Sequence, residues 1–152
     1  MQIDLAFSPR WTREDLGRVR VYTAPDFTVA PDVVFEVFPI FSRTEIEARE
    51  VLLHDVPPEI EVRAERPENT ATVNGWPITV QVVSLHDASG EFRELRLLAH
   101  YHVLVVQAFV LVRASNVERF QSHRAQIQEL LTSAKIDLND DRPAAISELW
   151  TM

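Results

Sequence analysis

The sequence contains no cysteine, which excludes a disulfide framework, a thiol nucleophile and a zinc site built from thiolates. It also contains only three glycines, Gly17, Gly75 and Gly90. The glycine-rich loops that hold phosphate groups, G-x-G-x-x-G and G-x-x-x-x-G-K, are therefore absent. Cysteine-based chemistry and phosphate binding by glycine-rich loops are therefore excluded. No other set of residues indicates a particular catalytic reaction.

Basic residues are also few, because 15 Lys and Arg stand against 23 Asp and Glu and give a formal net charge of -8. Nucleic-acid phosphates are bound by clustered Lys and Arg, so we expect no nucleic-acid partner. The first residues, MQIDLAFSPRWTRED, have neither the basic leader nor the apolar segment of a signal peptide. From this, and from a length of 152 residues that suits one domain, we expect a single-domain cytoplasmic protein.

No apolar run is long enough to span a membrane. The longest, LLAHYHVLVVQAFVLV at residues 97–112, is interrupted by polar side chains, whereas a spanning helix needs about 20 apolar residues. Its second half is rich in Val and Phe, which favours a strand. The preceding EFRELRLL alternates polar and apolar residues. We therefore predict a half-exposed strand, a hairpin connection at AHYH (99–102), and a central strand covered on both faces.

Other segments have the composition of strands and belong to the same sheet. They cover residues 17–24, 32–40, 59–67, 69–73 and 77–85. Asn74-Gly75 is a strong signal for a two-residue turn, because a type I′ turn needs positive φ at both positions. Consecutive hairpin-type connections from residue 59 onward predict an antiparallel meander.

Two segments, residues 42–55 and 115–136, are predicted to be helices. Each begins with an S-x-x-E capping box, at Ser42 and at Ser115. The second segment carries one apolar stripe, formed by Val117, Phe120, Ile127, Leu130, Leu131 and Ala134. Strands together with surface helices predict a single α+β domain over residues 1–137. Residues 138–152 are predicted to form a polar tail with a short amphipathic helix, in which Ile146, Leu149 and Trp150 share one side.

The order of elements from Asn74 onward resembles a known superfamily. The pattern NGWPITVQVV, GEFRELRLL, VLVVQAFVLV and FQSHRAQIQELLTSAKI is similar to that of the PsbP-like superfamily, which includes PsbP, a yeast Ran-binding import factor and bacterial DcrB-like domains. The resemblance covers residues 17–137 and implies a curved antiparallel β-sheet sandwiched by α-helices, a three-layer α/β/α fold. It also implies a binding protein without enzymatic activity. One bacterial branch, the Eag chaperones of type VI secretion, agrees with this chain in size, acidity and absence of cysteine.

Candidate chemical sites centre on three histidines. His100 and His102 in a strand-like H-x-H project to the same side, a geometry that can ligate a metal, with His86 as a neighbour from a hairpin end. A pocket near His86, His100 and His102 is the basis of the alternative function, a small-molecule or metal-dependent enzyme. Neither a third ligand nor a second shell is identified, so we expect no metal and no cofactor. Ser84, His86 and Asp87 contain the letters of a triad, but such close neighbours are not expected to converge on one substrate atom.

Gln107 is the most informative irregularity, because a polar amide lies inside the apolar VLVVQAFVLV. It either bonds within the core, or it faces a groove. In the second case a concave sheet face would carry six residues, namely Arg93, Leu95, Leu97, Val105, Gln107 and Phe109. Such a groove would match what the resemblance to the Eag chaperones implies: a protein-binding module, a secretion-associated adaptor or chaperone that holds an apolar or amphipathic helix of a client protein. A homodimer formed through the sheet or its edge is expected, since an unpaired edge invites association.

Overall fold

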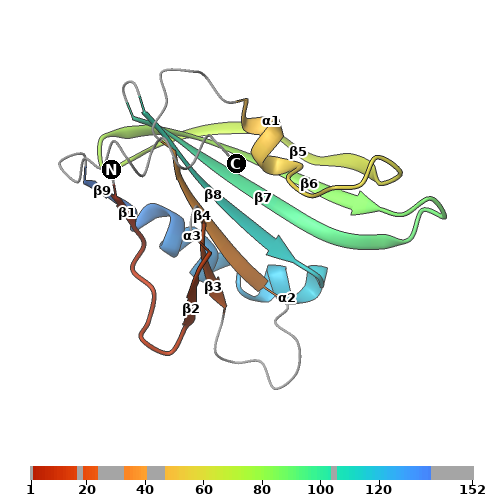
Figure 1. The fold of residues 1–152 in the computed structure, drawn as a ribbon, viewed down its shortest axis with the longest axis horizontal. Coiled ribbons are helices and arrows are strands. Elements are labelled where there is room, and N and C mark those ends of the chain that lie inside the picture. The colour runs from red at the N-terminus through yellow and green to blue at the C-terminus, as the bar shows by residue number, and fades with distance from the viewer. Residues whose placement is uncertain (1, 17–18, 24–32, 41–46, 104–105, 138–152) are drawn as a thin grey trace.

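The computed structural model of the chain describes residues 2–16, 19–23, 33–40, 47–103 and 106–137. Within these residues, seven antiparallel strands form one sheet in the order β2-β3-β4-β8-β7-β6-β5 (Figure 1). The strands are β2 (Thr12–Asp15), β3 (Arg20–Thr23), β4 (Val33–Ile40), β5 (Glu61–Val73), β6 (Trp76–His86), β7 (Phe92–Val103) and β8 (Val106–Ala114). A separate pair joins β1 (Gln2–Asp4) to β9 (Lys135–Asp137). The helices are α1 (Ala48–Leu52), α2 (Val117–Ser122) and α3 (Arg124–Thr132).

The predicted meander is confirmed, because β5, β6, β7 and β8 are consecutive in the chain and adjacent in the sheet. The strands predicted at 59–67 and 69–73 join into one long strand, β5, with register shifts at its middle. Asn74 and Gly75 connect it to β6 with φ values of 48° and 85°, the positive φ at both positions that the turn signal predicted.

The predicted hairpin connection at AHYH is wrong. These residues lie inside β7, which continues to Val103, and β8 begins at Val106. The reason is the alternation of the side chains: Ala99 and Tyr101 are fully buried on one face, while His100 and His102 lie on the other. Polar rings that alternate with buried residues belong to a strand with two different faces, not to a turn.

The helix predicted at 115–136 is divided at His123 into α2 and α3, and its last residues form β9 instead. The capping residue is Asn116 rather than Ser115, since the side chain of Asn116 accepts a hydrogen bond from the backbone N–H of Arg119 at 3.1 Å. The apolar stripe is confirmed in the main, although Val117 is exposed.

The helix predicted at 42–55 is represented by α1, which begins only at Ala48. Its predicted capping box lies outside the described residues. So does the predicted tail of residues 138–152. Within the described residues, no helix has the length and hydrophobicity that a membrane crossing requires.

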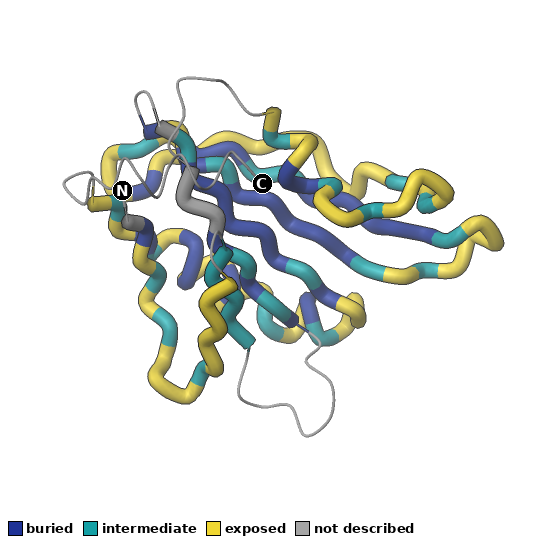
Figure 2. The backbone as a smooth tube through the Cα atoms, in the orientation of Figure 1, coloured by how far each residue is buried: buried dark blue, intermediate teal, exposed yellow. Residues whose placement is uncertain are grey.

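Two hydrophobic clusters occupy the two faces of the sheet. On β8, Ala108, Val110 and Val112 belong to the larger cluster, which also receives the buried side chains of α2 and α3. Phe109 and Leu111, which alternate with them, belong to a smaller cluster that receives α1. Figure 2 shows the resulting buried centre of the sheet and its exposed hairpin ends. A helix of five residues is not a full layer, so the three-layer sandwich stays a prediction, while the antiparallel, sheet-rich α+β fold is confirmed.

The two edge strands, β2 and β5, are exposed and carry charges of both signs. Strand β5 also contains Pro67, within a stretch where the register shifts. Charges, proline and bulges are the features by which edge strands avoid pairing with other chains. The predicted homodimer through the sheet edge therefore stays a prediction, and these two edges do not favour it.

Tyr101 joins the sheet to the C-terminal helix. Its ring is fully buried, and its hydroxyl donates a hydrogen bond of 2.7 Å to the backbone oxygen of Leu131. Burial raises the pKa of Tyr101, so the hydroxyl keeps its proton. The bond also satisfies a carbonyl in the last turn of α3, where no intrahelical donor remains.

We expect Tyr101→Phe to lower the free energy of unfolding by about 1 to 3 kcal/mol, because the carbonyl of Leu131 stays buried without its donor. Urea unfolding measures this change. Thr132→Ala is the matched control, since it removes an exposed hydroxyl from the same helix and is expected to change stability by about 0.5 kcal/mol or less. Equal effects of the two variants would contradict the assigned role of Tyr101.

Candidate functional site

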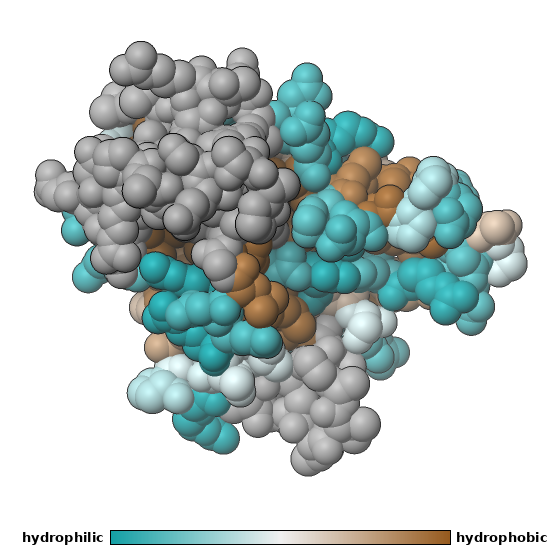
Figure 3. Space-filling view, viewed as in Figure 1, coloured by the Kyte–Doolittle hydropathy of each residue, from teal (hydrophilic) through white to brown (hydrophobic). Residues whose placement is uncertain are grey.

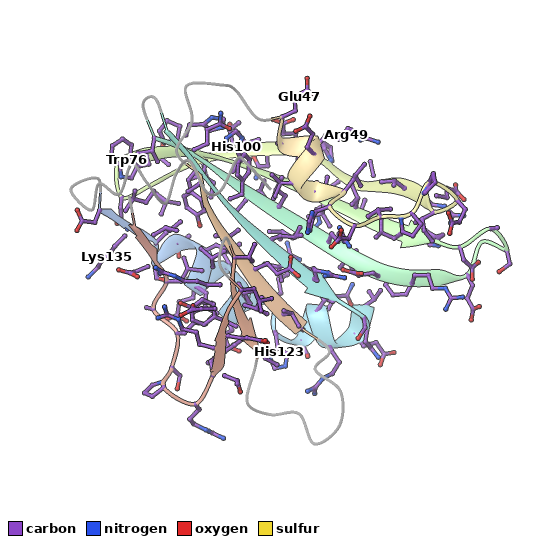
Figure 4. All side chains as sticks on the ribbon, viewed as in Figure 1. Glu47, Arg49, Trp76, His100, His123 and Lys135 are labelled. Carbon is purple, nitrogen blue, oxygen red and sulfur yellow. The ribbon has the colours of Figure 1, made fainter. Side chains whose placement is uncertain are left out.

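The candidate site is a polar area on the sheet face that carries α1, and we call it the histidine face. It consists of five side chains from β6, β7 and β8, namely Thr79, Gln81, His100, His102 and Gln107. Pairing places them together, because His102 lies directly opposite Gln107, and Thr79 directly opposite His100. Figure 4 shows His100 towards the end of β7 that is remote from the β6–β7 turn.

The two imidazole rings lie against each other, as the H-x-H spacing predicted. Their centroids are 4.0 Å apart, and the ring of His100 stacks on that of Phe109 with a centroid distance of 4.3 Å. His102 is exposed and its Nε2 forms a hydrogen bond of 2.8 Å with the hydroxyl of Thr79. His100 is thus held between an aromatic ring beneath it and a second imidazole beside it.

Two polar atoms of the histidine face lack a hydrogen-bond partner in the described part of the chain: Nε2 of His100 and Oε1 of Gln107. Both atoms are buried, although their residues are only half-buried. The side chain of Gln107 lies within reach of His100, because its interaction with the imidazole raises the pKa of His100 against the effect of burial. A buried polar atom without a partner costs about 1 to 3 kcal/mol, so such atoms call for an explanation.

His100 is uncharged at neutral pH. Burial and, to a smaller extent, the neighbouring His102 lower the pKa of this imidazole to about 4. A neutral imidazole has one N–H donor and one acceptor nitrogen. His100 therefore contributes hydrogen-bonding groups to the histidine face but no charge.

The six residues predicted to share a concave face do not all lie on one face. Gln107 and Phe109 lie on the side of α1, whereas Leu95 and Leu97 are buried in the larger cluster on the opposite side. The prediction grouped odd-numbered residues of both strands. In the observed register, Leu97 pairs with Val112 and His102 with Gln107, so an odd residue of β7 shares its face with even residues of β8.

The two remaining residues of that set belong elsewhere. Arg93 is exposed near the β6–β7 turn, where its guanidinium lies 2.8 Å from a carboxylate oxygen of Asp87. Val105 lies outside the described residues. The concave surface predicted from these six residues is therefore reduced to Gln107 and Phe109, together with the two histidines of β7.

The pocket near His86, His100 and His102 is not formed. His86 lies at the last position of β6, while His100 pairs with Thr79 near its beginning, a separation of about 23 Å along the strand. His86 also faces the other side of the sheet, where its ring meets Phe92. Within the described residues, no group of three or more His, Asp or Glu side chains is arranged to hold a metal ion.

Ser84 and His86 do meet, because residues two apart on a strand share a face, but they do not form a triad with Asp87. The Ser84 hydroxyl lies 2.9 Å from Nε2 of His86 and donates to the carboxylate of Glu65 on β5. In a catalytic triad the acid bonds the histidine, whereas here it bonds the serine. Ser84 is also 3% exposed, so the hydroxyl does not face a substrate.

A buried charge network, which sequence reasoning missed, anchors α1 beside the histidine face. Arg96 is 2% exposed, and its Nη1 donates to the backbone oxygens of Leu52 at 2.9 Å and His54 at 2.8 Å. Its Nε lies 3.1 Å from Glu94, which also accepts hydrogen bonds from Arg113. These carbonyls end α1, so the cation of Arg96 meets the negative end of the helix.

The network extends to β4, since Arg113 donates to Glu36 at 2.9 Å. Burial alone would raise the pKa of the Glu94 carboxyl, but hydrogen bonding from Arg113 and the charge of Arg96 hold it below its usual value. Hydrogen bonding to Glu94 and Glu36 raises the pKa of Arg113. All four side chains are therefore paired, and α1 is fixed over the smaller cluster.

Figure 3 shows the surface of one side of the molecule, where the described hydrophobic residues form separate areas between hydrophilic ones. Two side chains of large hydrophobic residues are exposed in the described part of the chain, Leu16 and Val117. The other large hydrophobic side chains of the described residues are buried or half-buried.

Solved structures with the same fold have very different sequences. The PsbP protein CyanoP of Synechocystis sp. PCC 6803 aligns with a TM-score of 0.64 at 8% identity, over 89% of this chain and 86% of that chain. The yeast Ran-binding protein Mog1p of Saccharomyces cerevisiae aligns with a TM-score of 0.57 at 11% identity, over 88% and 89%. LpqN, involved in cell envelope biogenesis of Mycobacterium tuberculosis, aligns with a TM-score of 0.52 at 15% identity, over 88% and 82%.

These alignments show a PsbP/Mog1-like fold for this chain, as the resemblance in sequence pattern implied. No protein-family model matches the sequence, and no curated protein matches it. At such low identity the likeness concerns the fold alone. The residues of the histidine face must therefore be interpreted from their own geometry.

We expect Arg96→Met to lower the free energy of unfolding by about 3 to 5 kcal/mol, because it leaves two carbonyls of α1 and part of Glu94 without a donor. Arg93→Met is the control, since this arginine of the same strand also pairs with a carboxylate but is exposed, and its loss is expected to cost about 1 kcal/mol or less. Urea unfolding of both variants measures the difference. Similar values would contradict the anchoring role.

The stability of the protein is expected to fall as the pH decreases from about 6.5 to 4. The folded state holds His100 at a pKa of about 4, below its ordinary value of 6.5, so the unfolded chain takes up this proton first. His100→Phe keeps the stacking on Phe109 and removes this contribution, about 1 to 2 kcal/mol after allowance for the partial exposure of the ring. Unfolding curves at constant ionic strength measure it, and identical pH dependence in both proteins would refute the assignment.

Proposed function

We propose that this protein is a non-enzymatic protein-binding module and that it contacts its partner through the histidine face. The observation that carries the proposal is the pair of adjacent buried atoms without partners, Nε2 of His100 and Oε1 of Gln107. Each such atom costs the folded protein free energy, and a partner recovers that cost if a small rotation of the half-buried His100 and Gln107 side chains turns the atoms outward.

The chemistry of the two atoms indicates what a partner must supply. The Gln107 oxygen accepts hydrogen bonds, and Nε2 of the neutral His100 either donates or accepts. A hydroxyl group donates one hydrogen bond and accepts another. One Ser or Thr side chain of a partner is therefore able to satisfy both atoms when the proton of His100 is on Nε2.

The position of the histidine face supports the same proposal. Helix α1 is fixed by Arg96 over Val83, Leu98 and Leu111, so that part of the sheet is not available to a partner. The histidine face continues the same strands beyond this cluster, and His102 is exposed there. A rigid sheet that presents a few polar groups next to an aromatic ring is a suitable surface for recognition.

A protein with the same fold also supports the proposal. Mog1p, which shares this fold, is a Ran-binding protein, so the fold serves protein binding in at least that case. Within this class we propose the more specific role predicted from the sequence: a cytoplasmic, secretion-associated adaptor or chaperone that holds an apolar or amphipathic helix of a client. Such a helix would place a small polar residue opposite Gln107.

A pair of synthetic helical peptides tests the proposal, one rich in Leu and Ala with a single central Ser, the other with Ala at that position. We expect the Ser peptide to bind more tightly at neutral pH by about 1 to 2 kcal/mol, roughly 5- to 30-fold in Kd, because it satisfies both atoms. Fluorescence anisotropy of labelled peptides measures the two affinities.

Gln107→Leu is expected to abolish the preference for Ser while leaving the free energy of unfolding unchanged or raised, since it removes an unpaired polar atom. Gln128→Leu on the exposed side of α3 is the matched control and should keep the preference. If the Gln107→Leu variant retained the preference, or if neither peptide bound, this site would not be the binding surface.

A further inference from the structure

The Asn74-Gly75 turn has a second property besides joining two strands. Both residues are exposed, and a Cβ added at Gly75 would meet no atom within 4 Å, so the tip of the turn is open to solvent. Val73 pairs with Trp76, and in such a two-residue turn the ladder does not use the N–H of Gly75. An unhindered backbone nitrogen therefore follows an asparagine side chain.

The side chain of Asn74 also makes a long-range contact. Its Nδ2 donates a hydrogen bond of 2.7 Å to the backbone oxygen of Ala134, which is 1% exposed and lies between α3 and β9. Trp76 and Lys135, the sequence neighbours of Gly75 and Ala134, lie on the same side of the molecule in Figure 4. One amide group thus ties the tip of the β5–β6 hairpin to the end of the C-terminal helix.

We propose that Asn74 is a site of spontaneous deamidation and that its conversion releases this tie. In the reaction the backbone nitrogen of Gly75 loses its proton and attacks Cγ of Asn74. The bond from Cγ to Nδ2 breaks, ammonia leaves with the proton, and a succinimide ring forms. Water then opens the ring at one of its two carbonyls and yields either aspartate or isoaspartate.

The product is unable to restore the contact. An aspartate at position 74 presents a carboxylate oxygen, an acceptor with negative charge, to the carbonyl oxygen of Ala134, where the native amide presents a donor. Isoaspartate lengthens the backbone and is incompatible with the two-residue turn that sets the register of β5 on β6. Since ammonia is lost, each conversion is permanent.

The native contact also protects the site. The hydrogen bond holds the departing nitrogen on Ala134, and a φ of 48° at Asn74 belongs to a turn whose geometry is set by the strands. Reaction therefore requires a transient opening of the hairpin tip. We expect deamidation to be slower in the folded protein than in an isolated peptide of the same sequence, yet faster than at any other asparagine of the described residues.

Other asparagines provide internal controls. Asn69 is exposed in β5 but precedes Thr70, whose branched side chain hinders the backbone nitrogen. Asn116 caps α2 and precedes Val117, which is branched as well. We expect neither of them to convert on the same timescale.

The experiment incubates the full chain at 37 °C and mildly alkaline pH, next to a synthetic peptide of residues 70–79. Peptide mapping by mass spectrometry is expected to find aspartate and isoaspartate at position 74 and no conversion at Asn69 or Asn116. Ion exchange then separates the converted protein, which carries one more negative charge, for thermal unfolding. Conversion at Asn74 no greater than at Asn69 and Asn116, after an incubation many times longer than the peptide needs to convert fully, would overturn the proposal.

Two variants test the consequence. Asn74→Asp reproduces the product and is expected to lower Tm by about 2 to 4 °C or more. Asn74→Gly suits a positive φ, has no amide to lose, and is expected to show no time-dependent loss of Tm under the same incubation. Converted protein that melts at the Tm of the unconverted protein would show that release of the contact has no effect, and would overturn the proposed link.

Discussion

The pairing of β7 with β8 decides which side chains reach each face of the sheet. Because Leu97 lies opposite Val112, one face receives Ala99, Tyr101 and Val110 and packs on α2 and α3. The other face receives the alternate residues and carries α1, the buried charges and the histidine face. A shift of this register by one residue would move every one of these side chains to the wrong side, so the large cluster of buried residues strongly specifies it.

On the face that carries α1, the buried cation of Arg96 occupies a position where an apolar side chain would be usual. Arg96 satisfies the carbonyls that end a five-residue helix, which has little stability of its own. Such networks add little net stability, but they define one arrangement, since any displacement leaves a charge without a partner. The helix is thereby held over one part of the sheet, and the unpartnered polar atoms of His100 and Gln107 lie beyond it.

The sequence predicted the features that depend on the spacing of neighbouring residues. It did not predict contacts between residues that are far apart in the chain. Alternation and the Asn-Gly signal predicted the meander, and the apolar stripe predicted the buried side of α3. His100 and His102 suggested a turn because their polarity masked the buried Ala99 and Tyr101 between and beside them. Gln107 was identified as unusual, but its neighbours depend on the register. The Arg96 network was beyond prediction, because its partners come from three segments far apart in the chain.

The pairing of β1 with β9 has a consequence for the order of folding. Gln2 lies opposite Asp137, so these short strands close a loop that contains nearly the whole chain, whereas β5 to β8 pair through short turns. Contacts between residues that are distant in sequence carry the larger entropic cost of loop closure and form late. The meander is therefore the natural nucleus. We expect β1 and β9 to join last and to open first, as a local fluctuation that leaves the seven-stranded sheet intact.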